Sequence, residues 1–121
     1  MSAPFFDSDI LTDWLRGVPS AKQELSRYAQ HRMSRICWTE LMACEPLETR
    51  RNLQKILYPI EVVEVDARIA DAAATIMYRN NIALQRAIIL ATAQVNGSIL
   101  ITRNIKDFSA EMPGIRIPYK I

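Results

Sequence analysis

A three-layer α/β/α domain with a central, mostly parallel sheet is the fold that this sequence predicts, as one domain over residues 1–121. The chain has 121 residues, half of them hydrophobic and only three of them glycine, which is enough for one helix-rich hydrophobic core. Short apolar segments alternate with helical patterns in the order β-α-α-β-α-α-β-α-α-β-β. Residues 86–95 are apolar on almost every side, as in a helix enclosed between other layers.

The first half of the chain opens with an apolar strand and continues with helical patterns. An amphipathic stripe from Ile10 to Leu15 predicts a helix that Gly17 ends. Glu45 precedes a proline and must leave the α region, which breaks a later helical pattern. The predicted elements are a strand at 3–6, helices at 10–15 and from Pro19 to about Arg32, a strand at 33–37, and a helix at 38–57 broken at Pro46.

The second half repeats the alternation. Val and Ile dominate residues 60–65, which predicts a strand. Asp66 is a good N-cap for a helix at 67–80, and Asn81 closes that helix. Gly97 ends the enclosed apolar helix. The remaining predicted elements are strands at 98–102 and 114–118.

The bulk properties exclude several classes of protein. A formal net charge of +2 is too small to indicate a nucleic-acid partner by itself. Asp7 interrupts the first apolar run before a signal peptide could form, and no run approaches the roughly 20 apolar residues of a membrane span. Cys37 and Cys44 are about 10 Å apart along the predicted helix, too far for a disulfide. We therefore expect a cytoplasmic protein with two reduced, buried thiols and no membrane contact.

Acidic side chains follow three of the predicted strands. Asp7 ends the first strand, Glu40 lies in the first turn of the helix after the second, and Asp107 follows the strand at 98–102. Ligands of open parallel sheets bind outside the carboxyl ends of the strands, so we expect these acids to converge on one cleft, with Asp9 beside them. A hard divalent cation relieves their repulsion and activates water for attack on a phosphodiester. Each acid alone also suits a helix start, where it caps free N–H groups.

The stretches "FFDSDILTDWL", "SRICWTELMA" and "AIILATAQVNGSILITRNIKDF" carry a family resemblance. They are similar to the opening strand with its "DTNVL" turn, the segment with the active-site Glu, and the pair "DAIIAATA" and "LVTRNVKDF" of the PIN-domain family, in particular its VapC-type toxins. The resemblance implies a PIN-like fold and a metal-dependent endoribonuclease for single-stranded RNA. It also implies Mg²⁺ or Mn²⁺ as cofactor, a cognate VapB-like antitoxin as partner, and a homodimer.

The resemblance also implies roles for individual residues. Asp7 matches the first metal-binding acid and Glu40 the second, which would make both of them catalytic. The late acid falls at position 104 or 107, where only Asp107 is acidic. The implied supporting residues are Ser8, Asp9, Thr102 and Asn104, with Arg103 at the substrate rim.

Arg86 departs from the family pattern, because it stands where the family has its third acid, at the head of a helix. A cation there is unfavourable for the helix dipole as well as for a metal. In one interpretation the guanidinium binds the acids Asp7, Glu40 and Asp107 and stands in for the cation. In the other it extends to solvent and leaves a weakened three-acid site. Two functions stay open: a VapC-like ribonuclease impaired by Arg86, and a catalytically disarmed PIN-fold module that binds RNA, an antitoxin or another protein.

Overall fold

A five-stranded parallel sheet forms the centre of the computed structural model, which describes residues 3–120. The strand order is β3-β2-β1-β4-β5, and each neighbouring pair is parallel. In this register Phe5 of the central strand lies between Arg32 and Leu100. The strands are β1 (Phe5–Phe6), β2 (Arg32–Ser34), β3 (Glu61–Val63), β4 (Leu100–Ile101) and β5 (Ile115–Arg116).

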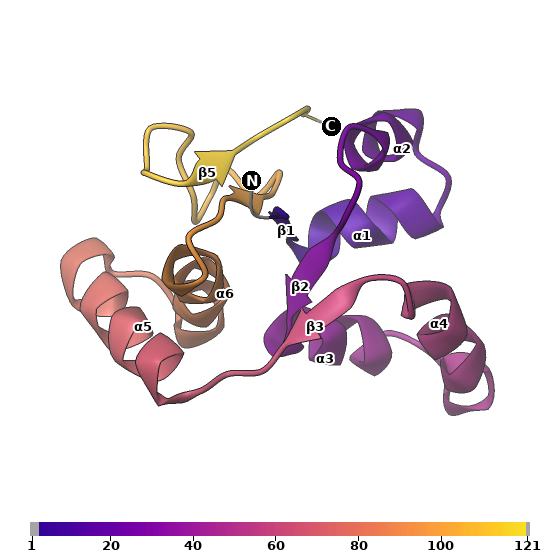
Figure 1. Cartoon of the computed structure of the whole chain (residues 1–121), viewed down its shortest axis with the longest axis horizontal. Coiled ribbons are helices and arrows are strands. Elements are labelled where there is room, and N and C mark those ends of the chain that lie inside the picture. Colours follow the sequence, from indigo (N-terminus) through magenta and orange to yellow (C-terminus); the bar gives the residue numbers. More distant parts are fainter. Residues whose placement is uncertain (1–2, 121) are drawn as a thin grey trace.

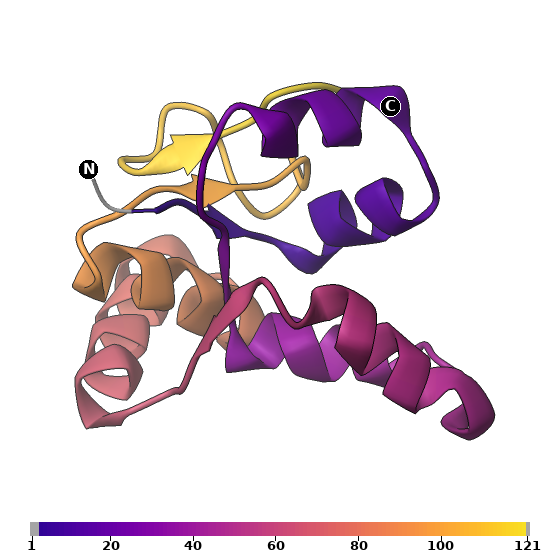
Figure 2. The same ribbon diagram turned by 45° about the vertical axis from the view of Figure 1, so that its right-hand side comes forward.

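Six α-helices complete the three layers. They are α1 (Ser8–Leu15), α2 (Pro19–Ser26), α3 (Arg35–Ala43), α4 (Arg50–Leu57), α5 (Ala67–Asn80) and α6 (Leu84–Val95), with a 3-10 turn at Leu47–Thr49. In Figures 1 and 2, α5 and α6 lie together at the lower left of the molecule, whereas α1 and α2 lie at its upper right and α3 and α4 at its lower right. The crossovers explain this arrangement: the chain moves outward from β1 to β3 and then returns to β4, and right-handed connections place the two groups of helices on opposite faces. The predicted three-layer α/β/α fold is confirmed.

The core lies between the sheet and these helices. The side chains of β1 and β4 are fully buried, which is typical of central parallel strands covered on both faces. Helix α6 is buried from Ala87 to Ala93 except at Ile88, as its apolar sequence predicts. No helix of the described chain is long and apolar enough to cross a membrane.

Several predicted boundaries are wrong, and one of them matters for the site. The strand predicted at 33–37 ends at Ser34, because the Ser34 hydroxyl accepts a hydrogen bond from the Ile36 amide and starts α3 there. Glu40 therefore lies in the second turn of its helix, with Cys37 one turn before it on the same face.

Other corrections are smaller. The helix predicted to reach Arg32 ends at Ser26, and the enclosed helix starts at Leu84 instead of 86. The strands predicted at 3–6, 60–65, 98–102 and 114–118 are each shorter. Only one of the two thiols is buried: Cys37 is enclosed, whereas Cys44 is exposed.

Candidate functional site

Asp7 stands at the carboxyl end of β1, where the chain turns into α1. Its side chain caps that helix by accepting a hydrogen bond of 2.8 Å from the Ser8 amide. The Thr102 hydroxyl, directly after β4, donates to the other carboxylate oxygen at 2.8 Å. The residue is completely buried, so the fold takes its charge out of water and fixes its orientation.

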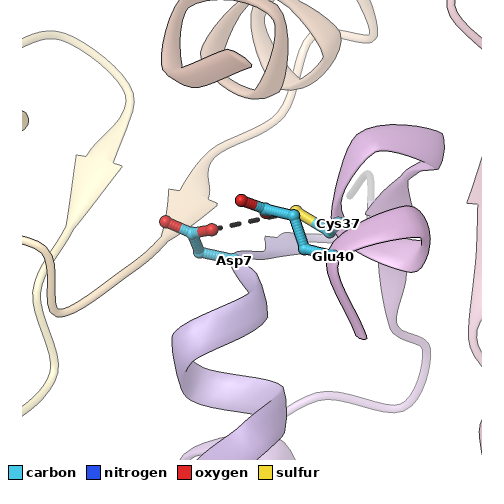
Figure 3. Close-up of side chains that lie close together, drawn as sticks. All are labelled: Asp7, Cys37 and Glu40. Atoms are coloured by element: carbon cyan, nitrogen blue, oxygen red, sulfur yellow. Dashed lines mark hydrogen bonds between the residues drawn. The ribbon is translucent and has the colours of Figure 1, made fainter. Parts of the chain in front are cut away.

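Glu40 approaches Asp7 from α3. The Ser8 hydroxyl donates to Glu40 Oε1 at 3.0 Å, which holds the glutamate over the start of α1. The Cys37 thiol lies beside both acids and donates to Asp7 Oδ1 at 3.8 Å. One ligand atom from each of the three residues lies within 4.8 Å of the others, and Figure 3 shows all three side chains turned toward one point.

Arg86 occupies the space between the two carboxylates. Its Nη1 donates to both oxygens of Asp7 at 3.1 Å, and its Nη2 donates to both oxygens of Glu40 at 2.9 and 2.7 Å. The helix that carries it has no side-chain cap, and the two acids compensate the cation at its positive end. Burial alone would lower the pKa of Arg86, but Asp7 and Glu40 outweigh burial and raise it. The guanidinium therefore remains charged and does not extend to solvent.

Asp9 is a third acid near this pair. Its Oδ2 accepts a hydrogen bond of 3.2 Å from the Arg103 amide and one of 3.4 Å from the Thr102 hydroxyl. Burial and the neighbouring charge of Asp7 raise the pKa of Asp9 to about 6. The sequence-predicted residues Asp7, Ser8, Asp9, Glu40, Arg86 and Thr102 therefore form one connected network.

Asp107 makes no direct hydrogen bond to the acids of this network and is linked to it through Asn104, whose backbone amide donates to the Thr102 hydroxyl at 3.1 Å. The Asn104 side-chain amide donates to Asp107 Oδ2 at 2.9 Å, and the Asp107 amide donates back to Asn104 Oδ1 at 3.3 Å. Asp107 belongs neither to the group of close ligand atoms around Asp7 nor to the lining of the adjacent pocket. The two candidates for the late acid position thus bind each other within the loop after β4.

A pocket of about 520 Å³ opens beside these acids. Arg103, which the sequence predicts at a substrate rim, lines this pocket, but its guanidinium donates to Asp13 at 2.6 and 3.1 Å. The lining residues are Ser8, Asp9, Glu40, Arg86, Arg103, Asn104, Ile105, Lys106 and Lys120.

Sequence reasoning missed four contributors to this region: Asp13, Cys37, Lys106 and Lys120. A correct start for α3 would have placed Cys37 on the face of Glu40. No signal in the sequence predicts that Lys120 lies near Lys106, which precedes it by more than a dozen residues.

A divalent cation does not fit this arrangement while Arg86 is in place. All four carboxylate oxygens of Asp7 and Glu40 accept from the guanidinium, whereas Mg²⁺ needs such oxygens at about 2.0–2.1 Å. The third close group, the thiol of Cys37, is a soft ligand that Mg²⁺ does not prefer. Burial, together with the charges of the two acids, raises the pKa of this thiol well above its usual value.

Comparison with known proteins identifies the family. The model of the PIN domain matches residues 5–110. A chain of a toxin–antitoxin complex from Klebsiella pneumoniae is 35% identical, with a TM-score of 0.91 over 98% of this chain and 100% of that one. FitAcB from Neisseria gonorrhoeae (22% identity, TM-score 0.76) and VapBC2 from Rickettsia felis bound to a promoter DNA fragment (18%, 0.75) share the fold, each over 94% of this chain and 96% of theirs. No curated protein sequence matches significantly. The chain belongs to the PIN domain family.

Proposed function

We propose that this chain is a VapC-like toxin: a cytoplasmic PIN-domain endoribonuclease for single-stranded RNA whose activity is impaired by Arg86. Membership of the PIN family supports the nuclease class. The 35% identical relative, itself part of a toxin–antitoxin complex, supports the toxin role and a VapB-like antitoxin as partner. The observation that carries the proposal is the convergence of Asp7 and Glu40 at the carboxyl ends of neighbouring strands, beside an open pocket.

The proposed roles follow from this placement. Asp7 and Glu40 are the catalytic acids that would hold Mg²⁺ or Mn²⁺, and Asp107 is the late acid of the pattern. The metal, when bound, would activate water and hold the scissile phosphate. The residues proposed to support these groups are Ser8, Asp9, Thr102 and Asn104.

Arg86 sets the condition for any such chemistry. Replacing an acid by arginine removes one ligand and places a like charge next to a cation. At 4 Å and an effective dielectric near 20, two unit charges repel by about 4 kcal/mol, and a divalent cation doubles the charge product. Even after heavy screening, we expect the affinity for metal to fall by far more than tenfold. A metal enters only when the guanidinium leaves Asp7 and Glu40.

The second candidate is a disarmed PIN module that binds RNA or a protein partner without cleaving it. The four hydrogen bonds from Arg86 favour it, because a guanidinium held in fork geometry by two carboxylates cannot lose its proton to make room for a metal. The two candidates differ in one measurable property, which is metal-dependent cleavage by the native chain.

The test compares the native chain with Arg86→Asp and with the control Arg68→Asp, which makes the same change of charge on an exposed residue of α5. Each protein is titrated with Mn²⁺ by calorimetry and assayed on an unstructured RNA. We expect Arg86→Asp to gain metal affinity by far more than tenfold and to cleave faster, while Arg68→Asp behaves like the native chain.

Three other results would change the proposal. Equal metal affinity and equal cleavage in native and Arg86→Asp proteins would refute impairment by Arg86. A variant that binds metal without cleaving RNA would support the disarmed module. A monomeric molar mass in light scattering would contradict the homodimer that we also propose. Failure to co-purify with a co-expressed antitoxin would contradict the antitoxin partner.

A further inference from the structure

The C-terminal segment 115–120 brings a lysine to the pocket from the far end of the chain. We propose that Lys106 and Lys120 bind the backbone phosphates of single-stranded RNA at this pocket, and that Asp13 and Tyr119 position Lys120 for this task. The inference rests on the proposed function, since it assigns the substrate contacts of the same site. It gives the substrate role to two lysines instead of to Arg103.

The arginines of the pocket are already engaged. Arg86 donates to Asp7 and Glu40 through both terminal nitrogens, and Arg103 donates to Asp13 through Nε and Nη2. A phosphate would have to compete with a buried carboxylate for either guanidinium.

The two lysines are in the opposite situation. Both are exposed, and both line the pocket. Within residues 3–120, no carboxylate lies within ion-pairing distance of either ammonium group. An ammonium group is a strongly hydrated point charge on a flexible stem, suited to phosphates whose positions vary along a single strand. The uncommitted positive charge of the pocket is therefore carried by Lys106 and Lys120.

Buried acids anchor the segment that delivers Lys120. The Tyr119 hydroxyl donates to Asp13 Oδ2 at 2.8 Å, one residue before the lysine. Arg116 donates to the two oxygens of Glu24 at 2.7 and 3.0 Å. Figure 1 shows the segment leaving β5 and passing toward α2, away from the sheet. Without these anchors, the last residues of an edge strand would fray.

Asp13 connects both sides of the pocket rim. Its carboxylate accepts from Arg103 in the loop after β4 and from Tyr119 in the C-terminal segment. Burial acts to raise the pKa of Asp13, but the hydrogen bonds from Arg103 and Tyr119 outweigh it and lower the pKa. The acid thus stays ionised at neutral pH and holds the loop of Lys106 and the segment of Lys120 together.

RNA binding can be measured without metal or cleavage. The full chain is titrated into a fluorescently labelled, unstructured RNA oligonucleotide in EDTA, and anisotropy is followed at several salt concentrations. We expect Lys106→Gln and Lys120→Gln each to weaken binding about three- to tenfold and to reduce the salt slope by about 0.7, the value for one phosphate contact on a single strand. The control Lys55→Gln removes the same charge from an exposed site on α4, outside this pocket, and should change neither quantity.

Tyr119→Phe tests positioning, because it removes one hydroxyl and no charge. We expect it to weaken RNA binding nearly as much as Lys120→Gln, with the same reduction of the salt slope. The double variant Tyr119→Phe/Lys120→Gln should bind no more weakly than Lys120→Gln alone, because both changes remove the same phosphate contact.

Any of three results would overturn the inference. Native-like binding by both lysine variants, or no binding by the native chain, would show that the two lysines do not make the proposed phosphate contacts. Full additivity in the double variant would show that Tyr119 does not act through Lys120. Binding that depends on the lysines in a chain that never cleaves RNA would refute the nuclease proposal and leave this inference standing.

Discussion

Two clusters of acid and arginine, each built around one buried acid, differ in their balance of charge. The Arg86 cluster consists of Asp7, Glu40 and Arg86, and the Glu24 cluster of Glu24, Tyr28 and Arg116. In the first, a single cation faces two carboxylates. In the second, one carboxylate faces Arg116 at 2.7 Å and the more exposed Arg27 at 4.0 Å, and the hydroxyl of Tyr28 donates to the same acid at 3.2 Å.

This difference in charge distinguishes the proposed site from a cluster that only stabilises the fold. The Glu24 cluster has no excess negative charge, and it links the C-terminal segment to α2. The Arg86 cluster carries an excess negative charge beside an open pocket, with Asp9 nearby as a further acid. An excess of buried negative charge is unfavourable unless a cation compensates it, so this cluster suits exchange of one cation for another. Charge balance, more than burial, distinguishes the proposed site from the Glu24 cluster.

The largest expected effect follows from removing the cation of the Arg86 cluster. Arg86→Met keeps a side chain about as long as the arginine stem but removes the guanidinium. Because buried Asp7 then lacks a cation next to the partly exposed Glu40, we expect a loss of about 3–5 kcal/mol in the free energy of unfolding at pH 7. Chemical denaturation in EDTA measures this loss. Added Mn²⁺ should stabilise the variant more than the native chain, because the ion replaces the missing charge. A variant as stable as the native chain without metal would show that the acids do not need Arg86.

The order of elements could be predicted because its signals are local. Gly17 and Gly97 end helices in the structure as their position in the sequence predicts, and apolar periodicity distinguishes helix from strand. The strand end at Ser34 could not be predicted, because Ile36 and Cys37 suit a strand as well as a helix and the hydroxyl of Ser34 decides between them.

The site was partly predictable for a different reason. Asp7 and Glu40 follow strands, and parallel strands bring their carboxyl ends to one edge. Asp13 and Glu24 give no such signal, because an acid within an amphipathic helix is normally exposed. Their partners Arg103 and Arg116 lie about ninety residues further along the chain, and only the tertiary fold brings them together.

The second effect, in order of size, concerns Asp9 and pH. Its pKa rises to about 6 on folding, so the native state binds this proton more tightly than the unfolded chain does. Stability should therefore fall as pH rises from about 4 to about 6, by at most about 3 kcal/mol at roughly 1.4 kcal/mol per pKa unit. Asp9→Asn should remove this part of the pH dependence in metal-free denaturation curves. A difference between native and variant that stays constant from pH 4 to 7 would contradict the assignment.

A smaller effect is expected in the Glu24 cluster. Arg116→Met leaves buried Glu24 with Tyr28 and the exposed Arg27, and because Arg116 is partly exposed we expect a loss of about 1–2 kcal/mol at neutral pH. Burial opposes the shift, but Arg116 outweighs it and lowers the pKa of Glu24, so this stabilisation is present above the usual value of 4.5 and disappears as pH falls through the folded pKa. Native and variant stabilities should converge in acid, and added Mn²⁺ should not rescue the variant.

The smallest effect tests the role of burial alone. Arg35 and Glu64 form an ion pair on the surface, where Arg35 also stacks over Trp38. Water and salt screen such a pair, and Arg35 keeps its contact with the ring after Glu64→Gln. We therefore expect no measurable shift in Tm at pH 7 and 0.15 M salt. A shift as large as that of Arg116→Met would mean that ion pairing stabilises this fold regardless of burial. Among these clusters, the pocket would then differ in the excess negative charge around Arg86.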